Sequence, residues 1–314
     1  MNAPDAPADH ATDGPVLDYP HMTCREGLLY RFGGLVPDTS VVRICIASHR
    51  RFINACSSLS NALRDVLLQD LHPHRMCLFH PSPDSPQVPI LASADPATET
   101  NFRIFDHLPS EVCPIPGIVP GTAQLVSIIA AAPMRAFVES VFARRDVAED
   151  YWTLPASASH HHARPGGLAQ HSFEVAHFFA MNAALTEVER DIGLVAALFH
   201  DIGKVWAYTD DLRQNSAALA LGHEQLGLKE LEPQLQVLEE QWEDAALALR
   251  AILSGQIRAR TNGSLPTSLL AQVRACDQRS CEHDRARNGT PRASQNLIWM
   301  PKRWKAEDEL GDPY

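Results

Sequence analysis

The residues in this sequence that could do chemistry begin with a histidine beside an aspartate. His200 and Asp201 end a strongly apolar run over residues 192–199, and Gly203 and Lys204 follow at once. An imidazole and a carboxylate that leave water need a partner, and a divalent cation suits both. The pair by itself is weak evidence, because a chain with 15 histidines also produces such a dipeptide by chance.

Two further segments place cation-binding side chains on helices. His171 shares a stripe with Val175 in a predicted helix over residues 168–185, and Asp277 shares a face with Val273. Helical bundles build metal sites from histidines and carboxylates that project inward from several helices. We therefore expect these two residues and the His-Asp pair to hold one of Mn²⁺, Fe²⁺, Co²⁺, Ni²⁺ or Zn²⁺, with Mg²⁺ as a further candidate. A cation there would acidify a coordinated water and polarise a phosphoryl oxygen.

A run of three histidines stands just before the helix that carries His171. His160, His161 and His162 precede a Gly-Gly turn at residues 166–167. In that position imidazoles could bind a substrate phosphate, orient the attacking water or add a metal ligand. A solvated histidine loop is the alternative interpretation.

The elements that must position these groups are nearly all helices. Apolar spacing predicts helices over residues 122–144, 168–185, 187–208, 217–231, 234–253 and 267–285. Pro133 is expected to kink or split the first of them. The fold class is therefore mainly α.

The first hundred residues have a different pattern. Strands are predicted over residues 41–46, 75–79 and 88–91, and helical spacing over 52–71. The predicted domains are a disordered segment (1–15), a small α+β module (16–108), a helical domain (109–287) and a C-terminal tail (288–314). In the tail, Trp299 and Trp304 lie among basic residues, where they could stack on single-stranded nucleic acid or pack onto the domain.

Composition limits the class of protein. The formal net charge is −11, which argues against a protein that coats nucleic acid by bulk electrostatics, although a metal site can still receive a phosphate locally. The seven cysteines form no CxxC pair, and no apolar run approaches the ~20 residues of a membrane span. The first 15 residues lack the basic and apolar regions of a secretory signal. We expect a cytoplasmic protein with no membrane partner and reduced thiols.

The order of the candidate ligands resembles a known family. His171, then His200 and Asp201 in the wording HDIGK, then Asp277, all in a helical context, resembles the HD superfamily of metal-dependent phosphohydrolases. The resemblance implies an HD-domain helical bundle in which these four residues are the metal ligands. It also implies that Lys204 contacts phosphate.

A narrower resemblance lies upstream. Residues 154–162 (LPASASHHH) and 163–168 (ARPGGL) are similar to the three-histidine signature of TraI-type domains, which occur in MobH-type conjugative relaxases. The resemblance extends back through residues 115–120 and implies action on nucleic acid during conjugative transfer. Thr153 departs from it, because a histidine often stands before the Pro-Ala-Ser segment.

The same region also resembles YhaM-type exoribonucleases. His161 and His162 before the Gly-Gly turn match them, and so do residues 208–210 and His223. In dinuclear HD proteins extra histidines hold a second metal, so the resemblance makes His223 a candidate ligand; the alternative is a surface histidine beside Glu224. Residues 254–256 (SGQ) depart from the pattern, which has two histidines there.

These observations lead to a metal-dependent phosphoester hydrolase as the first hypothesis. Its expected substrate is single-stranded nucleic acid, and its expected partners include proteins of a conjugation complex. The negative charge that develops at phosphorus is neutralised by Lys204, Arg164 and the three histidines His160, His161 and His162. The second hypothesis is a nucleotide or cyclic-nucleotide phosphohydrolase, which the charge of −11 fits. The third is a non-catalytic binding module with a vestigial metal site, which the departure at residues 254–256 supports.

Overall fold

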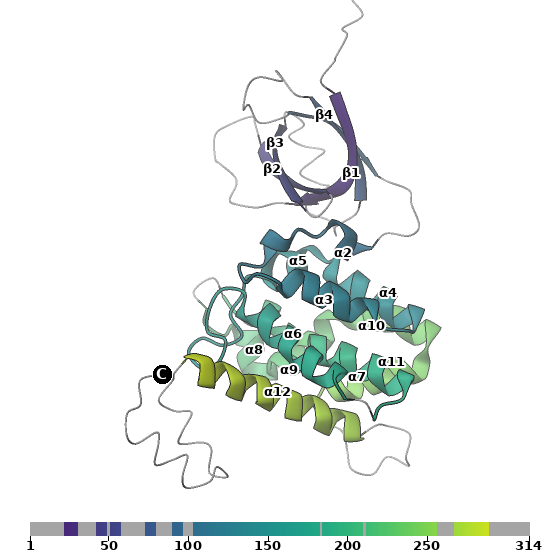
Figure 1. The fold of residues 1–314 in the computed structure, drawn as a ribbon, viewed down its shortest axis with the longest axis vertical. Coiled ribbons are helices and arrows are strands. Elements are labelled where there is room, and N and C mark those ends of the chain that lie inside the picture. The colour runs from purple at the N-terminus through teal and green to yellow at the C-terminus, as the bar shows by residue number, and fades with distance from the viewer. Residues whose placement is uncertain are drawn as a thin grey trace, which may run out of the picture.

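The structure, a computed structural model, describes a β barrel followed by a helical domain (Figure 1). The described residues are 22–30, 42–48, 51–57, 73–79, 90–96, 103–182, 184–209, 212–255 and 267–288. The mainly helical fold with a small N-terminal module is confirmed. The predicted disordered segment (1–15) and almost all of the predicted tail lie outside the described residues.

Five strands form the N-terminal barrel. They are β1 (Met22–Tyr30), β2 (Val42–Ser48), β3 (Arg51–Ser57), β4 (Pro73–Phe79) and β5 (Ile90–Pro96). The barrel closes in the order β1-β2-β3-β5-β4, with β3 and β5 parallel and the other pairs antiparallel. Leu28, Leu91 and the alternate residues Met76 and Leu78 of β4 are buried in the barrel.

One predicted helix is wrong at its start. The spacing over residues 52–71 predicted a helix, but residues 51–57 form β3 and pair with β2 along the full length of that strand. A short apolar run fits the helical repeat and the strand repeat equally well. The hydrogen-bonding partners on β2 and β5 then favour a strand. The rest of that prediction, from residue 58 to residue 71, lies outside the described residues. The predicted strands at 41–46, 75–79 and 88–91 correspond to β2, β4 and β5.

The helical domain begins with α2 (Ile104–His107) and a short turn, η1 (Ser110–Val112). Its helices are α3 (Ile118–Ser127), α4 (Ala132–Phe142), α5 (Arg145–Asp150), α6 (Gly167–Ala180), α7 (Glu187–Phe199), α8 (Ser216–Leu221), α9 (His223–Glu230), α10 (Glu232–Gln241), α11 (Glu243–Leu253) and α12 (Thr267–Asn288). As predicted, Pro133 splits the first long segment, because a proline without an N–H is tolerated in the first turn of α4.

Helix α7 is the centre of this domain. Its start is fixed by a capping box, in which the Thr186 side chain accepts from the Glu189 N–H and the Glu189 carboxylate accepts from the Thr186 N–H. All of its residues from 191 to 199 are buried, and α4, α6, α11 and α12 pack around it (Figure 1). Close to its end, Phe199 packs on Phe142, so the apolar core stops where the His-Asp pair begins.

None of the helices that the structure describes has the length and the apolar character that crossing a membrane requires.

Candidate metal centre

The end of α7 delivers the first two candidate ligands. His200 is the C-cap of α7, and its Nδ1 donates to the Ala197 carbonyl at 2.8 Å. That bond holds the ring proton on Nδ1 and leaves the Nε2 lone pair free to bind a cation. Asp201 follows with its side chain buried, at the point where the chain leaves α7 and enters the short helix η2 (Ile202–Trp206).

Helices α6 and α12 bring the other two candidates to the same point. The side chain of His171 is fully buried, and its Nε2 lies 3.1 Å from Oδ1 of Asp277 and 3.6 Å from Oδ2 of Asp201. The Nε2 atoms of His171 and His200 are 3.2 Å apart. Nε2 of His200 is in turn 3.5 Å from Asp201 Oδ2 and 3.9 Å from Asp277 Oδ1. Donor atoms of His171, His200 and Asp277 thus lie within 4.8 Å of one another, and Asp201 Oδ2 lies within 3.6 Å of both histidine nitrogens.

This convergence fits a divalent cation. Donor atoms about 2.1 Å from a shared cation stand about 3.0 Å apart in an octahedral site and about 3.4 Å apart in a tetrahedral one. The donor distances here run from 3.1 to 3.9 Å. Two imidazole nitrogens 3.2 Å apart also cannot both carry bare lone pairs without repulsion, and a cation between them removes it. Two imidazoles and two carboxylates are the donor set that transition metals prefer.

Two further basic side chains contact Asp201. The Lys204 ammonium lies 2.6 Å from Asp201 Oδ2, and Nε2 of His223 lies 3.0 Å from Asp201 Oδ1. Burial alone would raise the pKa of Asp201, but the positive charge of Lys204, the neighbouring His200 ring and the hydrogen bond from His223 hold it well below its usual range. Burial would likewise lower the pKa values of Lys204 and His223, and the Asp201 carboxylate raises both. Asp201 is therefore ionised and paired on both oxygens.

Gly203 makes this arrangement possible. A Cβ at Gly203 would lie 1.8 Å from the carbonyl oxygen of His223 and 2.8 Å from the backbone nitrogen of Gly227. Only a residue without a side chain lets η2 approach α9 this closely. The glycine in the HDIGK segment thus brings His223 against Asp201. The roles predicted for His223 as a second-metal ligand and for Lys204 as a phosphate contact remain predictions.

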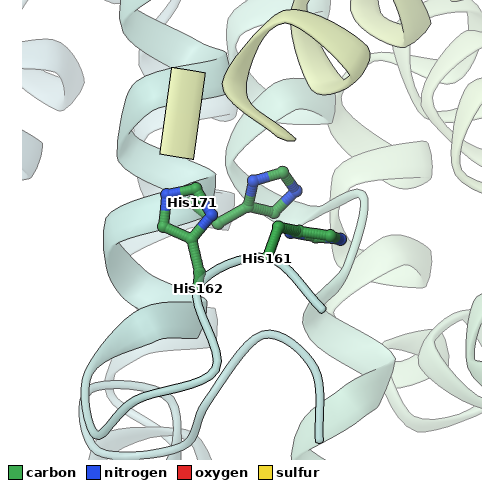
Figure 2. Close-up of side chains that lie close together, drawn as sticks. All are labelled: His161, His162 and His171. Carbon is green, nitrogen blue, oxygen red and sulfur yellow. The ribbon is translucent and has the colours of Figure 1, made fainter. Parts of the chain in front are cut away.

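Two histidines of the upstream loop, His161 and His162, lie beside His171 of α6 (Figure 2). One nitrogen of each of His161, His162 and His171 lies within 4.8 Å of the other two, and the exposed His160 is outside this group. The ring centroid of His161 is 4.9 Å from that of His171, and that of His162 is 5.1 Å away. Burial, together with positive neighbours, lowers the pKa of His161 to about 4, so its imidazole is neutral at pH 7.

Asp284 of α12 and Arg164 of the loop, which we call the clamp, hold the loop in this shape. His162 has a left-handed backbone (φ 48°), and its N–H donates to Asp284 Oδ2 at 2.6 Å. Arg164 donates to Asp284 Oδ1 at 2.8 Å and to Gln170 Oε1 at 2.7 Å. Gly167 lets the loop pack against α6, since a Cβ there would lie 1.9 Å from the His162 carbonyl oxygen. Arg164 is thus part of the clamp, and its predicted role in neutralising phosphate charge remains a prediction.

Sequence reasoning missed three carboxylate or hydroxyl side chains beside the centre. They are Glu174, Ser280 and the clamp residue Asp284. Burial would raise the pKa of Glu174, but hydrogen bonds from His162 and Ser280 lower it to about 2. Glu174 lies three residues after His171 and Ser280 three after Asp277, so helical spacing was a signal that could have found them.

Comparison with known families agrees with the geometry. Residues 168–280 match the model of the HD domain family. The match includes all four candidate ligands, His171, His200, Asp201 and Asp277. It begins after the three-histidine loop, so the TraI-type and YhaM-type resemblances remain predictions.

HD domains bind divalent metals and are generally metal-dependent phosphohydrolases. The donor set described above is consistent with that family property. No curated protein and no solved structure matches the chain.

Proposed function

We propose that this HD domain hydrolyses phosphodiester bonds of single-stranded nucleic acid, in a process linked to the conjugative transfer of a mobile element. The observation that carries the proposal is the convergence of four donor atoms, from His171, His200, Asp201 and Asp277, within one site. When bound there, a divalent cation supplies Lewis acidity to a phosphoryl oxygen and lowers the pKa of water.

The remaining side chains of the site suit the charge changes of phosphoester hydrolysis. Lys204 brings a buried ammonium to within 2.6 Å of one donor oxygen, so positive charge is already present where a phosphate would arrive. His161 is neutral, and its buried Nδ1 has no hydrogen-bond partner among the described residues. A neutral imidazole in that position can orient a water or a phosphate oxygen.

The choice of nucleic acid rests on two supports outside the metal site. The loop at residues 154–168 resembles the TraI-type signature, which is also the basis of the proposed link to conjugation. The N-terminal module is a closed five-stranded barrel, and five-stranded barrels of the OB type bind oligonucleotides. The barrel argument is an analogy of fold, so it supports the substrate class and no particular sequence.

A nucleotide or cyclic-nucleotide substrate is the second candidate. The net charge of −11 favours it, because a small anion needs only the local charge of the metal site, whereas a polynucleotide meets the field of the whole protein.

Turnover of a panel of substrates distinguishes these functions. Wild type should be incubated with Mn²⁺ and single-stranded DNA, RNA, mononucleotides or cyclic nucleotides, beside Asp201→Ala and the exposed control Asp244→Ala. We expect wild type and Asp244→Ala to cut an oligonucleotide and Asp201→Ala to be inactive. Cleavage of nucleotides alone would favour the second candidate. Bound metal with no turnover on any phosphoester would refute the enzyme and leave a binding module.

A further inference from the structure

A buried chain of hydrogen bonds runs from a carboxylate to the back of one metal-ligand histidine. His171 Nδ1 lies 3.0 Å from Ser280 Oγ, and Ser280 Oγ donates to Glu174 Oε2 at 2.8 Å. Ser280 is fully buried, and Glu174 is largely buried beside it. The chain thus links α6, α12 and α6 again, directly behind the four converging donor atoms.

The direction of these bonds fixes where the His171 proton lies. An ionised carboxylate can only accept hydrogen bonds, so the single hydroxyl proton of Ser280 points to Glu174. The Ser280 oxygen must then accept from His171, which places the imidazole proton on Nδ1. The lone pair is left on Nε2, which is the atom that faces His200, Asp201 and Asp277. His200 reaches the same tautomer through the Ala197 carbonyl.

Glu174 also orients a second histidine, His162 of the loop. Its Oε2 lies 3.2 Å from His162 Nε2, and its Oε1 accepts from Gln170 at 2.9 Å. The His162 proton is therefore on Nε2, and its Nδ1 is a buried acceptor without a partner among the described residues. One carboxylate thus sets the orientation of a ligand and of the loop histidine next to it.

We propose that Glu174 and Ser280 are positioning residues that hold the proton on Nδ1 of His171 and so set the affinity of the centre for its metal. The proposal rests on the metal centre described above and assigns neither residue to the chemical step. Partners of this kind behind a ligating histidine are typically worth about 10–100-fold in metal affinity.

Two substitutions break this chain of hydrogen bonds from Glu174 through Ser280 to His171, which we call the relay, in different ways. Ser280→Ala removes the hydroxyl and leaves His171 Nδ1 without its acceptor. Glu174→Gln keeps the shape but adds an amide N–H, which can donate to Ser280 and allow the hydroxyl to donate to His171 instead. That reversal moves the proton to Nε2, the tautomer that cannot bind metal. Glu282→Gln is the matched control, because Glu282 lies on α12 and accepts from Gln278.

The first measurement needs no metal. Nitrogen-15 NMR of the histidine side chains in the metal-free protein, with His171 identified through His171→Gln, reports which ring nitrogen is protonated. We expect Nδ1 of His171 to carry a proton in wild type and Glu282→Gln, whatever the state of Nε2, and to lose it partly or wholly in Ser280→Ala and Glu174→Gln. Circular dichroism checks that each variant is folded; if Ser280→Ala is not, Glu174→Gln carries the test alone.

The second measurement is metal affinity, by competition between the protein and a chelator for Mn²⁺ or Zn²⁺. We expect Ser280→Ala and Glu174→Gln to bind about 10–100-fold more weakly than wild type, and Glu282→Gln to bind equally. An unchanged tautomer, or a changed tautomer with unchanged affinity, would overturn the proposal. If wild type binds no divalent metal, the proposed function fails and the affinity part of the inference with it, whereas the tautomer measurement still decides whether the relay exists.

Discussion

Replacing Asp277 by asparagine should remove most of the stabilisation that a divalent cation gives this protein, while the metal-free fold stays close to wild type. Asp277 supplies a donor oxygen 3.1 Å from His171 Nε2, yet its side chain is 40% exposed, the most of the four ligands. An amide of the same shape can therefore stay in place with little cost to the metal-free protein. It loses the negative charge that a cation requires.

The size of the effect follows from mass action. A cation at 100 times its dissociation constant stabilises the folded state by about 2.7 kcal/mol. For a domain of more than 150 residues this corresponds to a rise in Tm of about 5–10 °C. If loss of the charged ligand weakens binding about 100-fold, the same cation concentration gives only about 0.4 kcal/mol and a rise of about 1 °C.

The assay is a thermal melt of wild type and Asp277→Asn in chelator and at increasing Mn²⁺ or Zn²⁺. Asp244→Asn, an exposed aspartate at the start of α11, is the control and should respond as wild type does. A rise in Tm for Asp277→Asn equal to that of wild type would show that Asp277 is not a ligand. Equal responses of all three proteins to Mg²⁺ alone would point to binding elsewhere on the surface.

Two further predictions concern the surroundings of the centre. Gly203→Ala should lower the free energy of unfolding, measured in urea titrations, by about 2 kcal/mol or more, because its Cβ would meet the His223 carbonyl oxygen at 1.8 Å. Gly121→Ala is the control and should cost less, because its Cβ would meet only the Phe173 ring, at 2.7 Å. The pKa of His161 is lowered from 6.5 to about 4 in the folded protein, so the unfolded chain binds the proton more readily. The free energy of unfolding of the metal-free protein should therefore fall by about 2 kcal/mol as the pH drops from 6.5 to 4. His161→Gln should flatten that part of the pH profile and the exposed His160→Gln should not, and an unchanged profile for His161→Gln would contradict the reasoning.

The helical half of the fold could be predicted from sequence because its signals are local. Apolar residues at helical spacing located the segments that form α3, α4, α6, α7 and α8 to α12, and Pro133 marked the break between α3 and α4; α5 and the breaks at Gly222 and Trp242 were not predicted. The barrel was harder, because strands are decided by partners that are distant in the chain. β3 takes its partners from β2 and β5, and nothing within residues 51–57 excludes a helix. β1 was not predicted at all, although it closes the barrel between β2 and β4.

The four candidate ligands could be singled out from sequence because His171, His200 and Asp277 continue the apolar face of a predicted helix and Asp201 follows His200 directly. Sequence could not show which of the loop histidines reach His171, because His160, His161 and His162 are identical in type and differ only in the direction of the backbone. That direction is set by Asp284, which accepts from the His162 N–H across 122 residues of sequence. The His-Asp dipeptide that ends at Asp284 gave no indication of a site, since its role exists only after α12 has packed against the loop.

Glu174 and Ser280 show where helical spacing stops being informative. Spacing places Glu174 on the face of His171, and Ser280 on the face of Asp277, one turn beyond each ligand. It does not say that the two meet, because they are 106 residues apart and their 2.8 Å bond depends on how α6 crosses α12. A polar residue one turn from a ligand is usually solvated. Here burial removes water from Ser280, so its proton has only Glu174 to bond, and the tautomer of His171 follows from that packing.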